Sequence, residues 1–456
     1  MSKDAAGAAP WLTWYGDDFT GSAAVMEVLA FASIPTVLFT SIPSDSLRER
    51  FADARAIGIA STARSKSPDW MAENLPAPLN WLDGLGAPIL HYKVCSTFDS
   101  SPESGSIGKA IETALALRPS DAVPMITAAP QMRRYQAFGH LFAGTFDGVF
   151  RLDRHPVMAR HPVTPMDEAD LLVHLARQTD LPSALIDLEM LAGDPQEALE
   201  TALAAGARIL SIDSMEEASE TAAGRLLWEN RDRLRFVVGS QGVEYALVRH
   251  WIASGRLAPA VPAGGAGAVD RIAAVSGSVS LSTARQLAHA GANGFALLAF
   301  PATCACGPEE DREAEIHRLI AEGVAAAARG ASPLVHSASG PDDPAVAAFR
   351  AALSSSSVDP AEANARIGDA LGRILDGILR ESGIRRAVIS GGDTSGYGMA
   401  RLGLQALVAR APTIPGAAIC TGYGESDHDG LEIALKGGQM GSEDFFDWVR
   451  SGGGPR

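Results

Sequence analysis

Short apolar runs alternate with amphipathic stretches along most of the chain. Residues 11–15 (WLTWY) predict a buried strand, and Val25, Val28 and Leu29 fall on one stripe of the helix expected at 23–32. Further apolar runs predict strands at 36–39, 56–60, 88–93, 123–127, 184–188, 209–213 and 236–240. Because helical patterns fall between most of these runs, the first half of the chain predicts a mostly parallel sheet covered on both faces.

A Gly-, Ala- and Pro-rich segment at 253–270 predicts a linker, and the same alternation restarts after it. Strands are expected at 272–275, 295–300, 386–389 and 417–420, and helices at 282–290, 314–329, 361–381 and 401–411. A chain of 456 residues favours two domains. The sequence therefore predicts an α/β protein with domains at 1–252 and 271–456, each a mostly parallel sheet flanked by helices, with a cleft between them.

Composition and charge narrow the class of protein. Hydrophobic residues make up 46% and charged residues 20% of the chain, which is typical of soluble globular proteins. A net charge of -16 without a Lys/Arg cluster argues against a nucleic-acid binder, and no apolar run approaches the ~18 residues of a membrane span. Few cysteines without paired spacing, and no signal peptide, favour the cytoplasm. The expected partner is a small molecule, and a homodimer is left open.

Two adjacent carboxylates follow the first predicted strand, within the turn 16–22. Ligands of open parallel sheets bind at the carboxyl ends of the strands, so Asp17 and Asp18 are candidates for catalysis or binding. The alternative is that Asp18 or Thr20 caps the following helix. Two aspartates in a row exceed what one cap needs.

Basic and hydroxyl side chains follow other strands of the first domain. Arg64 is a candidate clamp for a substrate carboxylate, or else a solvated surface arginine. The segment 93–108 contains Lys93, Ser96 and Thr97 and suits a polyhydroxylated acid; the alternative is a Ser-rich surface loop. Two further arginines in the loop 128–135 could face the same cleft or water.

Glycine-rich turns follow three strands of the second domain. In the turn 390–396, Gly391 and Gly392 would let a phosphate approach the backbone, ahead of Asp393 and Thr394 as helix cap, metal contact or proton acceptor. A capped turn without a ligand is the plain alternative. The turn 276–280 and the cluster 436–441 repeat this logic, and Lys436 could neutralise charge. Neither a G-x-x-x-x-G-K-[ST] nor a G-x-G-x-x-G motif is present.

Five short motifs follow one another in order between Asp17 and Gly441. They are DDFTG at 17–21, KVCST at 93–97, SGS at 276–278, GGDT at 391–394 and KGGQMG at 436–441. Taken together they resemble the four-carbon acid sugar kinase family. The resemblance implies an N-terminal acid-sugar domain, a C-terminal ATP domain, and phosphoryl transfer from ATP to a hydroxyl of a threonate, erythronate or 3-oxo acid.

By position, the resemblance implies two sets of contacts. Residues that would contact the acid sugar are Asp17, Asp18, Arg64, Lys93, Ser96 and Thr97. Residues that would contact ATP are Ser276, Ser278, Gly391, Gly392, Asp393, Thr394, Gly437 and Gly438. Cys95 stands where the family pattern has an aspartate, and Asp99 where it has an arginine. A branched 3-oxo-isoapionate-like acid is therefore as plausible as a plain tetronate.

Phosphoryl transfer requires positioning, charge neutralisation and a base. We hypothesise that Asp17 or Asp18 accepts the proton, that Arg64 and Lys93 hold the carboxylate, and that the glycine turn receives the phosphates bridged by Mg²⁺. A rival assignment makes Asp393 the base. The sequence assigns no protein metal ligands. Competing classes are a sugar-acid lyase, dehydrogenase or decarboxylase, of which the missing dinucleotide turn disfavours the dehydrogenase, and a non-catalytic sugar-acid-binding protein.

Overall fold

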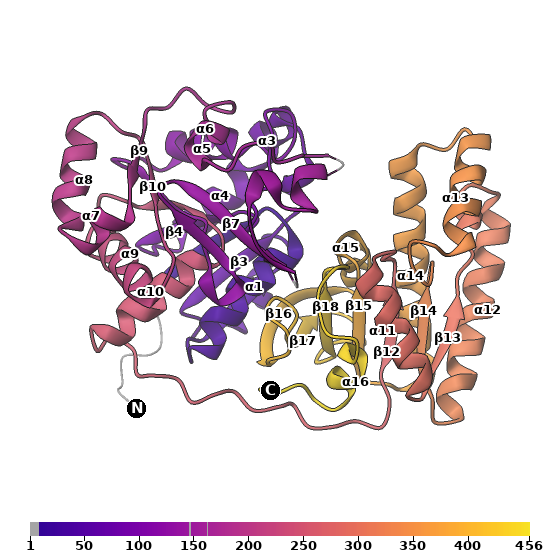
Figure 1. Ribbon diagram of the computed structural model, residues 1–456. Helices are drawn as coiled ribbons and strands as arrows, with labels where there is room; N and C mark the ends of the chain where they lie inside the picture. The colour runs from indigo at the N-terminus through magenta and orange to yellow at the C-terminus, as the bar shows by residue number, and fades with distance from the viewer. Residues whose placement is uncertain (1–8, 146, 162) are drawn as a thin grey trace. The chain divides into compact units, whose positions relative to one another are not determined.

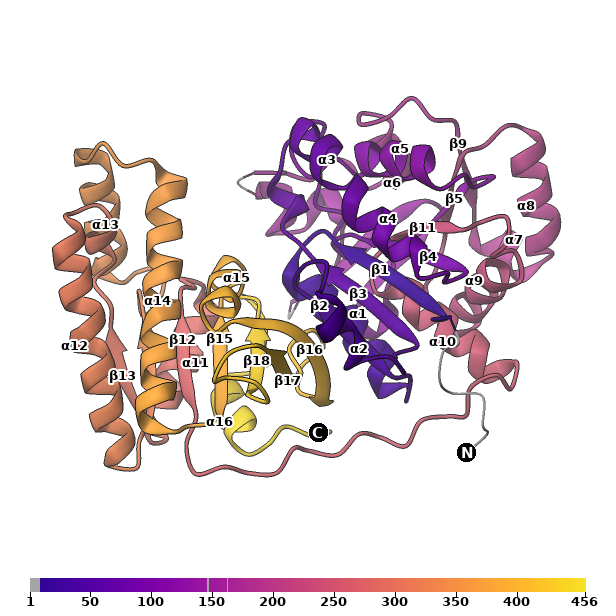
Figure 2. The ribbon, with the colours of Figure 1, turned by 180° about the vertical axis from the view of Figure 1, so that it is seen from behind.

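The computed structural model describes residues 9–145, 147–161 and 163–456. The chain divides into two compact units, Met1–Val261 and Pro262–Arg456. Each unit has a sheet of its own with helices packed against it (Figures 1 and 2). The predicted two-domain α/β architecture is confirmed.

The first unit is built on a parallel sheet with the strand order β2-β3-β1-β4-β11-β5-β10-β9. Its strands are β1 (Leu12–Gly16), β2 (Thr36–Phe39), β3 (Ala56–Ala60), β4 (Ile89–Lys93), β5 (Val123–Ile126), β9 (Ser183–Ile186), β10 (Ile209–Ile212) and β11 (Phe236–Gly239). The order reverses at β1, because β3 and β2 lie on one side and β4 on the other. Ligand sites of open α/β sheets lie at such a reversal, at the carboxyl ends of the strands.

Two groups of helices cover this sheet. The helices α1 (Phe19–Phe31), α9 (Glu217–Glu229) and α10 (Gly242–Ala253) form one packed group, and α3 (Pro68–Asn74), α4 (Pro76–Gly84) and α5 (Ile107–Leu117) form another. The remaining helices are α2 (Asp45–Glu49), α6 (Leu171–Leu175), α7 (Leu188–Ala192) and α8 (Pro195–Ala204). Strands β1 to β5 are buried along their whole length, as expected for a sheet with two covered faces.

A small antiparallel sheet follows β5 and was not predicted. It consists of β6 (Arg134–Ala137), β7 (His140–Thr145) and β8 (Gly148–Arg151), paired in chain order. The strands are short and mostly half-buried, so their sequence lacks the continuous apolar runs that identified the central strands. The start of β6 is held against the segment that follows β5 by two hydrogen bonds between the backbones of Ala129 and Arg134, 3.0 and 3.2 Å long.

The second unit has the strand order β13-β14-β12-β15-β18-β17-β16. Its strands are β12 (Ala273–Ser276), β13 (Phe295–Ala299), β14 (Ser332–His336), β15 (Arg386–Ser390), β16 (Leu404–Ala411), β17 (Ile419–Gly424) and β18 (Glu432–Lys436). The first five positions in this order are parallel, whereas β17 pairs antiparallel with β18 and β16. The order reverses at β12, which places the turns after β12, β14 and β15 together.

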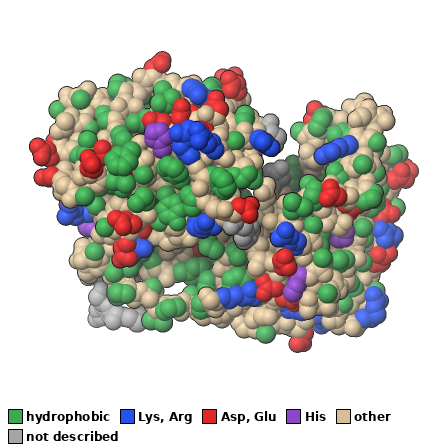
Figure 3. Space-filling model, viewed as in Figure 1, with side chains coloured by type: hydrophobic (Ala, Val, Ile, Leu, Met, Phe, Trp, Pro, Cys, Tyr) green, Lys and Arg blue, Asp and Glu red, His purple; other side chains and the backbone are tan. Residues whose placement is uncertain are grey.

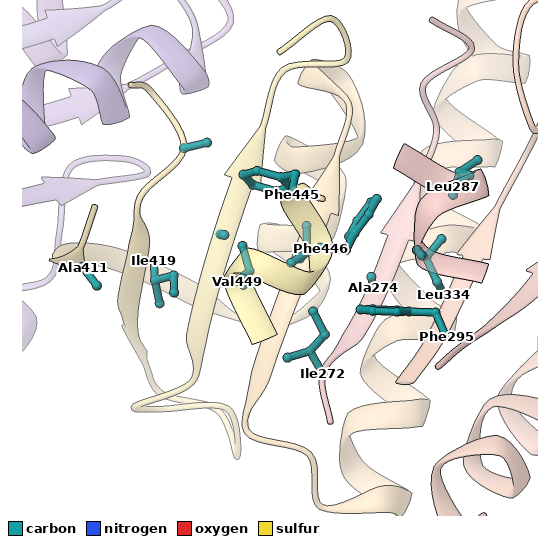
Figure 4. Close-up of a cluster of buried hydrophobic side chains, with 14 residues drawn as sticks. Ile272, Ala274, Leu287, Phe295, Leu334, Ala411, Ile419, Phe445, Phe446 and Val449 are labelled. Carbon is teal, nitrogen blue, oxygen red and sulfur yellow. The ribbon is translucent and has the colours of Figure 1, made fainter. Parts of the chain in front are cut away.

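A cluster of buried hydrophobic side chains joins α11 (Leu281–Ala292) and α16 (Phe445–Arg450) to one face of this sheet. Phe445, Phe446 and Val449 extend from α16 toward the strands, and Leu287 lies on α11 (Figure 4). The helices α12 (Glu309–Ala328), α14 (Pro360–Ser382) and α15 (Gly392–Arg401) form a second packed group, and α13 (Pro344–Ser355) joins the 3-10 turn Ala302–Ala305.

Two sequence predictions in this unit need correction. The helix predicted at 401–411 is wrong: α15 ends at Arg401, Gly403 has a φ of 64°, and the edge strand β16 follows. Leu404, Gln405 and Ala406 alternate between buried and exposed, which is the strand period. The segment predicted as a glycine turn at 390–396 is helical from Gly392 onward, so this predicted turn forms the start of α15.

Arg386, at the start of β15, forms hydrogen bonds to the first segment of the second unit, to its last helix and to the neighbouring strand β18. Its side chain is 2% exposed, and its Nε and Nη2 atoms both lie 2.6 Å from Oε2 of Glu432. Its Nη1 atom donates to the carbonyls of Gly267, Val449 and Arg450 at 2.8, 3.1 and 3.3 Å. One buried guanidinium thus connects β15 with the segment around Gly267 and with the last helix, α16.

Acidic and basic side chains are interspersed over the face shown in Figure 3. Within the described part of the chain, we find no helix with both the length and the apolar character that a bilayer crossing requires.

Candidate active site

The two aspartates after β1 converge on Arg64, which follows β3. Nη2 of Arg64 lies 2.8 Å from Oδ1 of Asp17 and 2.6 Å from Oδ1 of Asp18, while Nε makes a longer bond of 3.4 Å to Oδ2 of Asp17. The backbone repeats the link, since the Arg64 N–H donates to the Asp17 carbonyl at 2.9 Å. The structure therefore brings into direct contact three residues that the sequence analysis assigned to one acid-sugar site.

Asp18 also caps α1. Its Oδ1 accepts the Gly21 N–H at 3.0 Å and its Oδ2 accepts the Thr20 hydroxyl at 2.7 Å. Capping, which the sequence left as the plain alternative, thus occurs at Asp18. Asp17 takes no part in the cap, and its side chain is 3% exposed.

Lys93, the last residue of β4, approaches the same carboxylates. A Cβ built on Gly21 would lie 2.2 Å from Oδ1 of Asp18 and 2.6 Å from Nζ of Lys93, so the two groups meet over this glycine. Nζ donates to the Val94 carbonyl at 2.6 Å, and the side chain is almost completely buried. The cluster of Asp17, Asp18, Arg64 and Lys93, here called the acid–base cluster, contains two negative and two positive groups.

The two carboxyls of this cluster differ in acidity. Burial raises the pKa of Asp17, and the negative charge of Asp18 raises it further, against the opposing effect of Arg64. Burial also acts to raise the pKa of Asp18, but Arg64 and Lys93, with the hydrogen bonds from Thr20 and Gly21, outweigh it and lower the pKa. Asp17 is therefore the better proton acceptor, and Asp18 stays ionised.

The hydroxyl segment after Lys93 lies at the same edge of the sheet. Ser96 is half-buried and Thr97 is buried, with its Oγ1 atom 3.1 Å from Sγ of Cys95. Asp99 accepts a hydrogen bond from the Thr164 hydroxyl and lies 3.9 Å from Nδ1 of His161. Cys95 and Asp99, the two positions that depart from the family pattern, thus contact different residues: Cys95 contacts Thr97, and Asp99 contacts Thr164 and His161.

A pocket of about 610 Å³ opens among the turns of the second unit. Of the residues proposed from the sequence, Ser278, Gly391, Gly392, Thr394 and Gly438 line it. Ser276 and Gly437 do not, and the side chain of Asp393 lies outside the part of the chain that the structure describes. Ser276 is fully buried at the end of β12, beside Ser390 of β15, and both hydroxyls lack a hydrogen-bond partner among the described residues.

The backbone at Gly391 requires glycine. Its φ of 130° is in the region that L side chains avoid, and an added Cβ would lie 2.8 Å from Oγ1 of Thr394. A Cβ on Gly277 would lie 2.3 Å from the same hydroxyl. Gly392, by contrast, has nothing within 4 Å of an added Cβ. The first turn of α15 thus presents open backbone at Gly392 to the pocket.

The carbonyl of Gly438 fixes the position of the glycine-rich turn 436–441. It accepts hydrogen bonds from the hydroxyls of Ser280 at 2.6 Å and Thr283 at 2.9 Å, and Nζ of Lys436 lies 3.4 Å away. Nζ also donates to the Gly437 carbonyl at 3.0 Å. Burial lowers the pKa of Lys436 to about 8, so this amine titrates near neutral pH.

Sequence reasoning missed one wall of the pocket. It is lined by Ala345, Val346, Phe349 and Arg350 of α13, by Asn364, Ile367 and Gly368 of α14, and by Tyr397 of α15. The start of α13 had a recognisable signal, since Asp343 precedes Pro344 and caps the helix by accepting the Ala345 N–H at 2.9 Å. Phe349 and Tyr397 provide aromatic surface next to the glycine turns.

Among the described residues, no group of three or more His, Cys, Asp or Glu is arranged to hold a metal ion. The oxygen donors that line the pocket include the hydroxyls of Ser278, Ser280 and Thr394. Hard oxygen donors of this kind suit Mg²⁺.

The two units define a two-domain α/β protein with an acid–base cluster in one unit and a glycine-lined pocket in the other. Residues 12–247 match the family described as the sugar-binding N-terminal domain, and residues 273–446 match the nucleotide-binding C-terminal domain. The chain belongs to the four-carbon acid sugar kinase family, and the resemblance drawn from its motifs is confirmed.

Relatives are similar over nearly the whole chain. A 3-oxo-isoapionate kinase from Paraburkholderia graminis is 46% identical, covering 97% of this chain and 94% of its own. A 3-oxo-tetronate kinase from Pseudomonas fluorescens is 31% identical, covering 96% of both. The crystal structure of a Salmonella typhimurium LT2 protein has a TM-score of 0.78 at 24% identity, covering 96% of this chain and 98% of that one, and shares the fold.

Proposed function

We propose that this protein transfers the γ-phosphoryl group of ATP to a hydroxyl of a small 3-oxo sugar acid, with 3-oxo-isoapionate as the first candidate and 3-oxo-tetronate as the second. The observation that carries the proposal is the 46% identity, over 97% of the chain, to a 3-oxo-isoapionate kinase. The 3-oxo-tetronate kinases are more distant, at 31% identity or less among those compared.

The acid–base cluster would bind the acid sugar and activate its hydroxyl. Asp17 accepts the proton of the attacking hydroxyl, because its raised pKa makes it the better base and because the 3.4 Å bond to Arg64 is the one bond to its Oδ2 atom that we find among the described residues. Asp18 positions Arg64 and the start of α1. Arg64, Lys93, Ser96 and Thr97 contact the oxygens of the acid sugar.

In the transfer step the hydroxyl oxygen forms a bond to the γ-phosphorus while the bond from that phosphorus to the β–γ bridging oxygen breaks. ADP leaves, and the proton goes to Asp17. The protein forms no covalent bond to the substrates in this step; it positions the reactants and stabilises the developing charge.

ATP would bind in the pocket of the second unit. Backbone N–H groups at Gly391, Gly392 and the start of α15 would receive the phosphates, since a helix N-terminus favours anions. Ser278, Thr394 and Gly438, which line this pocket, would complete the ATP contacts, whereas Ser276 and Gly437 do not line it. Mg²⁺ would neutralise phosphate charge, with the hydroxyls of Ser278 and Thr394 as its protein contacts.

The test is ADP release by the purified full-length protein with ATP and a panel of acids. The panel contains 3-oxo-isoapionate, 3-oxo-tetronate, threonate and erythronate, and mass spectrometry identifies the phosphorylated product. We expect turnover with at least one 3-oxo acid. ADP release that is equal with and without every acid would reject the proposal.

A further inference from the structure

The cations of the acid–base cluster are already matched by its anions. Arg64 contacts both Asp17 and Asp18, and Lys93 meets Asp18 over Gly21. Two positive groups and two negative groups leave no net positive charge. An acid substrate brings one more carboxylate, and a buried carboxylate requires a cationic partner. The first unit must supply that partner from outside the cluster.

Arg134 is a cation without such a match. Its Nη1 atom donates to three backbone carbonyls, those of Met132, Arg133 and Gly144, at 3.1 to 3.3 Å. Among the described residues, its buried Nε has no hydrogen-bond partner, and its guanidinium forms no ion pair with a carboxylate. Carbonyls hold the guanidinium in place but do not neutralise its charge. Burial lowers the pKa of Arg134, Cys95 opposes this, and Arg133 adds to it.

The topology brings Arg134 to the edge that carries the acid–base cluster. In β11, Gly239 is level with Lys93 of β4 on one side and with Ile126 of β5 on the other. The segments that follow Lys93 and Ile126 therefore leave the sheet on either side of one strand, about 10 Å apart. Ala129, three residues beyond Ile126, holds Arg134 through the paired backbone hydrogen bonds.

Contacts around β11 keep this arrangement together. The Val94 N–H donates to the Gly239 carbonyl at 2.8 Å, and the Ser240 N–H donates to the Ile126 carbonyl at 3.0 Å. The side-chain amide of Gln241 contacts Sδ of Met132. The hydroxyl segment and the arginine loop are thus both attached to the end of the same strand.

We propose that Arg134 binds the carboxylate of the acid substrate, with Arg64 and Lys93 reserved for the aspartates and the substrate hydroxyls. The inference rests on the proposed function, because it assigns a role within the acid-sugar site. A guanidinium matches a carboxylate with two parallel hydrogen bonds, which a lysine cannot reproduce.

The neighbouring Arg133 supplies a matched control. It is exposed, has a φ of 57°, and donates to the Thr145 carbonyl on the outer hairpin. Both arginines carry the same charge and are adjacent in sequence. Of these two arginines, as the structure describes them, Arg134 alone has a buried nitrogen without a hydrogen-bond partner.

The experiment compares the wild type with Arg134→Gln, Arg134→Lys and Arg133→Gln, using 3-oxo-isoapionate and its neutral amide. We expect Arg134→Gln to raise the KM for the acid about 10- to 100-fold, because hydrogen bonds to charged groups are worth about 1.5–3 kcal/mol. Arg134→Lys should lie between, the KM for ATP should stay the same, and Arg133→Gln should change the KM for the acid less than about twofold. The wild type should bind the neutral amide weakly, and the KM for the amide should be the same in Arg134→Gln.

Two results would overturn the inference: an unchanged KM for the acid in a folded Arg134→Gln, or equal losses for acid and amide. If Arg134→Gln does not fold, Arg134→Lys provides the test, because it keeps the charge and loses the two parallel hydrogen bonds. A KM for the acid equal to that of the wild type would then contradict the inference. If no acid supports ADP release, calorimetric binding of the same acid to the wild type and Arg134→Gln separates failure of the kinase proposal from failure of the carboxylate site.

Discussion

Asp17 and Asp18 are neighbours in the sequence, and their carboxyl pKa values shift in opposite directions. Burial and the charge of Asp18 raise the pKa of Asp17, whereas Arg64, Lys93 and the capping hydrogen bonds lower that of Asp18. One arginine contacts both side chains. Two adjacent carboxyls thus differ in acidity, because Asp17 binds a proton more readily than Asp18 does.

Substitution of each aspartate by asparagine should have distinct effects. Asp17→Asn removes the proposed base and should lower kcat by about 10²- to 10⁴-fold, with an unfolding free energy near that of the wild type. Asp18→Asn keeps a good helix cap and should lower kcat less. Steady-state kinetics and urea unfolding measure both. Equal, small losses in kcat for the two variants would point to another base.

The pH dependence of kcat/KM should report the pKa of Asp17. The base must be ionised, so the rate falls as the pH falls through this pKa, and the midpoint lies above the ordinary aspartate value of 3.8. Removing the neighbouring charge lowers the pKa of Asp17. Asp18→Asn should therefore move the acidic limb to lower pH, and a limb that stays in place or moves upward would contradict the assignment.

Gly391 and Gly392 should respond differently to alanine. In Gly391→Ala the new Cβ would lie 2.8 Å from Thr394 Oγ1 at a φ of 130°, and we expect a loss of about 1–3 kcal/mol in the free energy of unfolding. In Gly392→Ala the Cβ meets open space, so stability should change by less than about 0.5 kcal/mol. The KM for ATP should still rise in Gly392→Ala, because the methyl group occupies the approach of a phosphate. Unchanged ATP kinetics would place the phosphates elsewhere.

Cys95→Asp should weaken binding of the acid. Cys95 lies within electrostatic range of Arg64 and Arg134, so a carboxylate at this position would add negative charge close to both. We expect the KM for the acid to rise about tenfold, with the KM for ATP unchanged. Cys95→Ser, which has nearly the same size and no charge, is the control and should retain the wild-type KM. An equal rise in both variants would indicate a packing effect.

Nucleotide binding near pH 8 should be accompanied by proton uptake at Lys436. Burial lowers the pKa of this amine to about 8, and a nearby polyphosphate would raise it again. Calorimetry in two buffers of different ionisation enthalpy should detect up to about half a proton per nucleotide, and Lys436→Met should abolish the difference. Without nucleotide, stability should rise as the pH increases from about 8 toward 10.5, because the unfolded chain binds this proton more tightly. Identical heats in the two buffers would contradict the linkage.

Local pattern was sufficient to locate the strand ends on which the two sites are built. β1, β4 and β15 are buried runs followed directly by polar or glycine residues, so Asp17, Lys93 and Gly391 were found where a parallel sheet exposes its edge. The pairing of Arg64 with two carboxylates was not predictable, because it joins residues that follow two different strands, β1 and β3, and Asp17 is 47 positions from Arg64 in the sequence. Only the strand order makes that contact.

The elements that escaped prediction have weaker local signals. Leu404–Ala411 contains good helix formers, and its pairing with β17 in the sheet favours the strand conformation. The hairpin strands that begin at Arg134 are half-buried. The same reason left Arg133 and Arg134 equivalent in the sequence, whereas the structure distinguishes them by burial.

The attachment of Arg386 to the last helix has a practical consequence for the length of the polypeptide. A chain shortened before Val449 would lose two of the carbonyls that hold this guanidinium, together with the Val449 side chain of the buried hydrophobic cluster. Each lost hydrogen bond to a buried charge costs about 1.5–3 kcal/mol. Removal of these C-terminal residues, for example by a carboxypeptidase, should therefore destabilise the second unit at the start of β15, the end of the strand opposite the pocket.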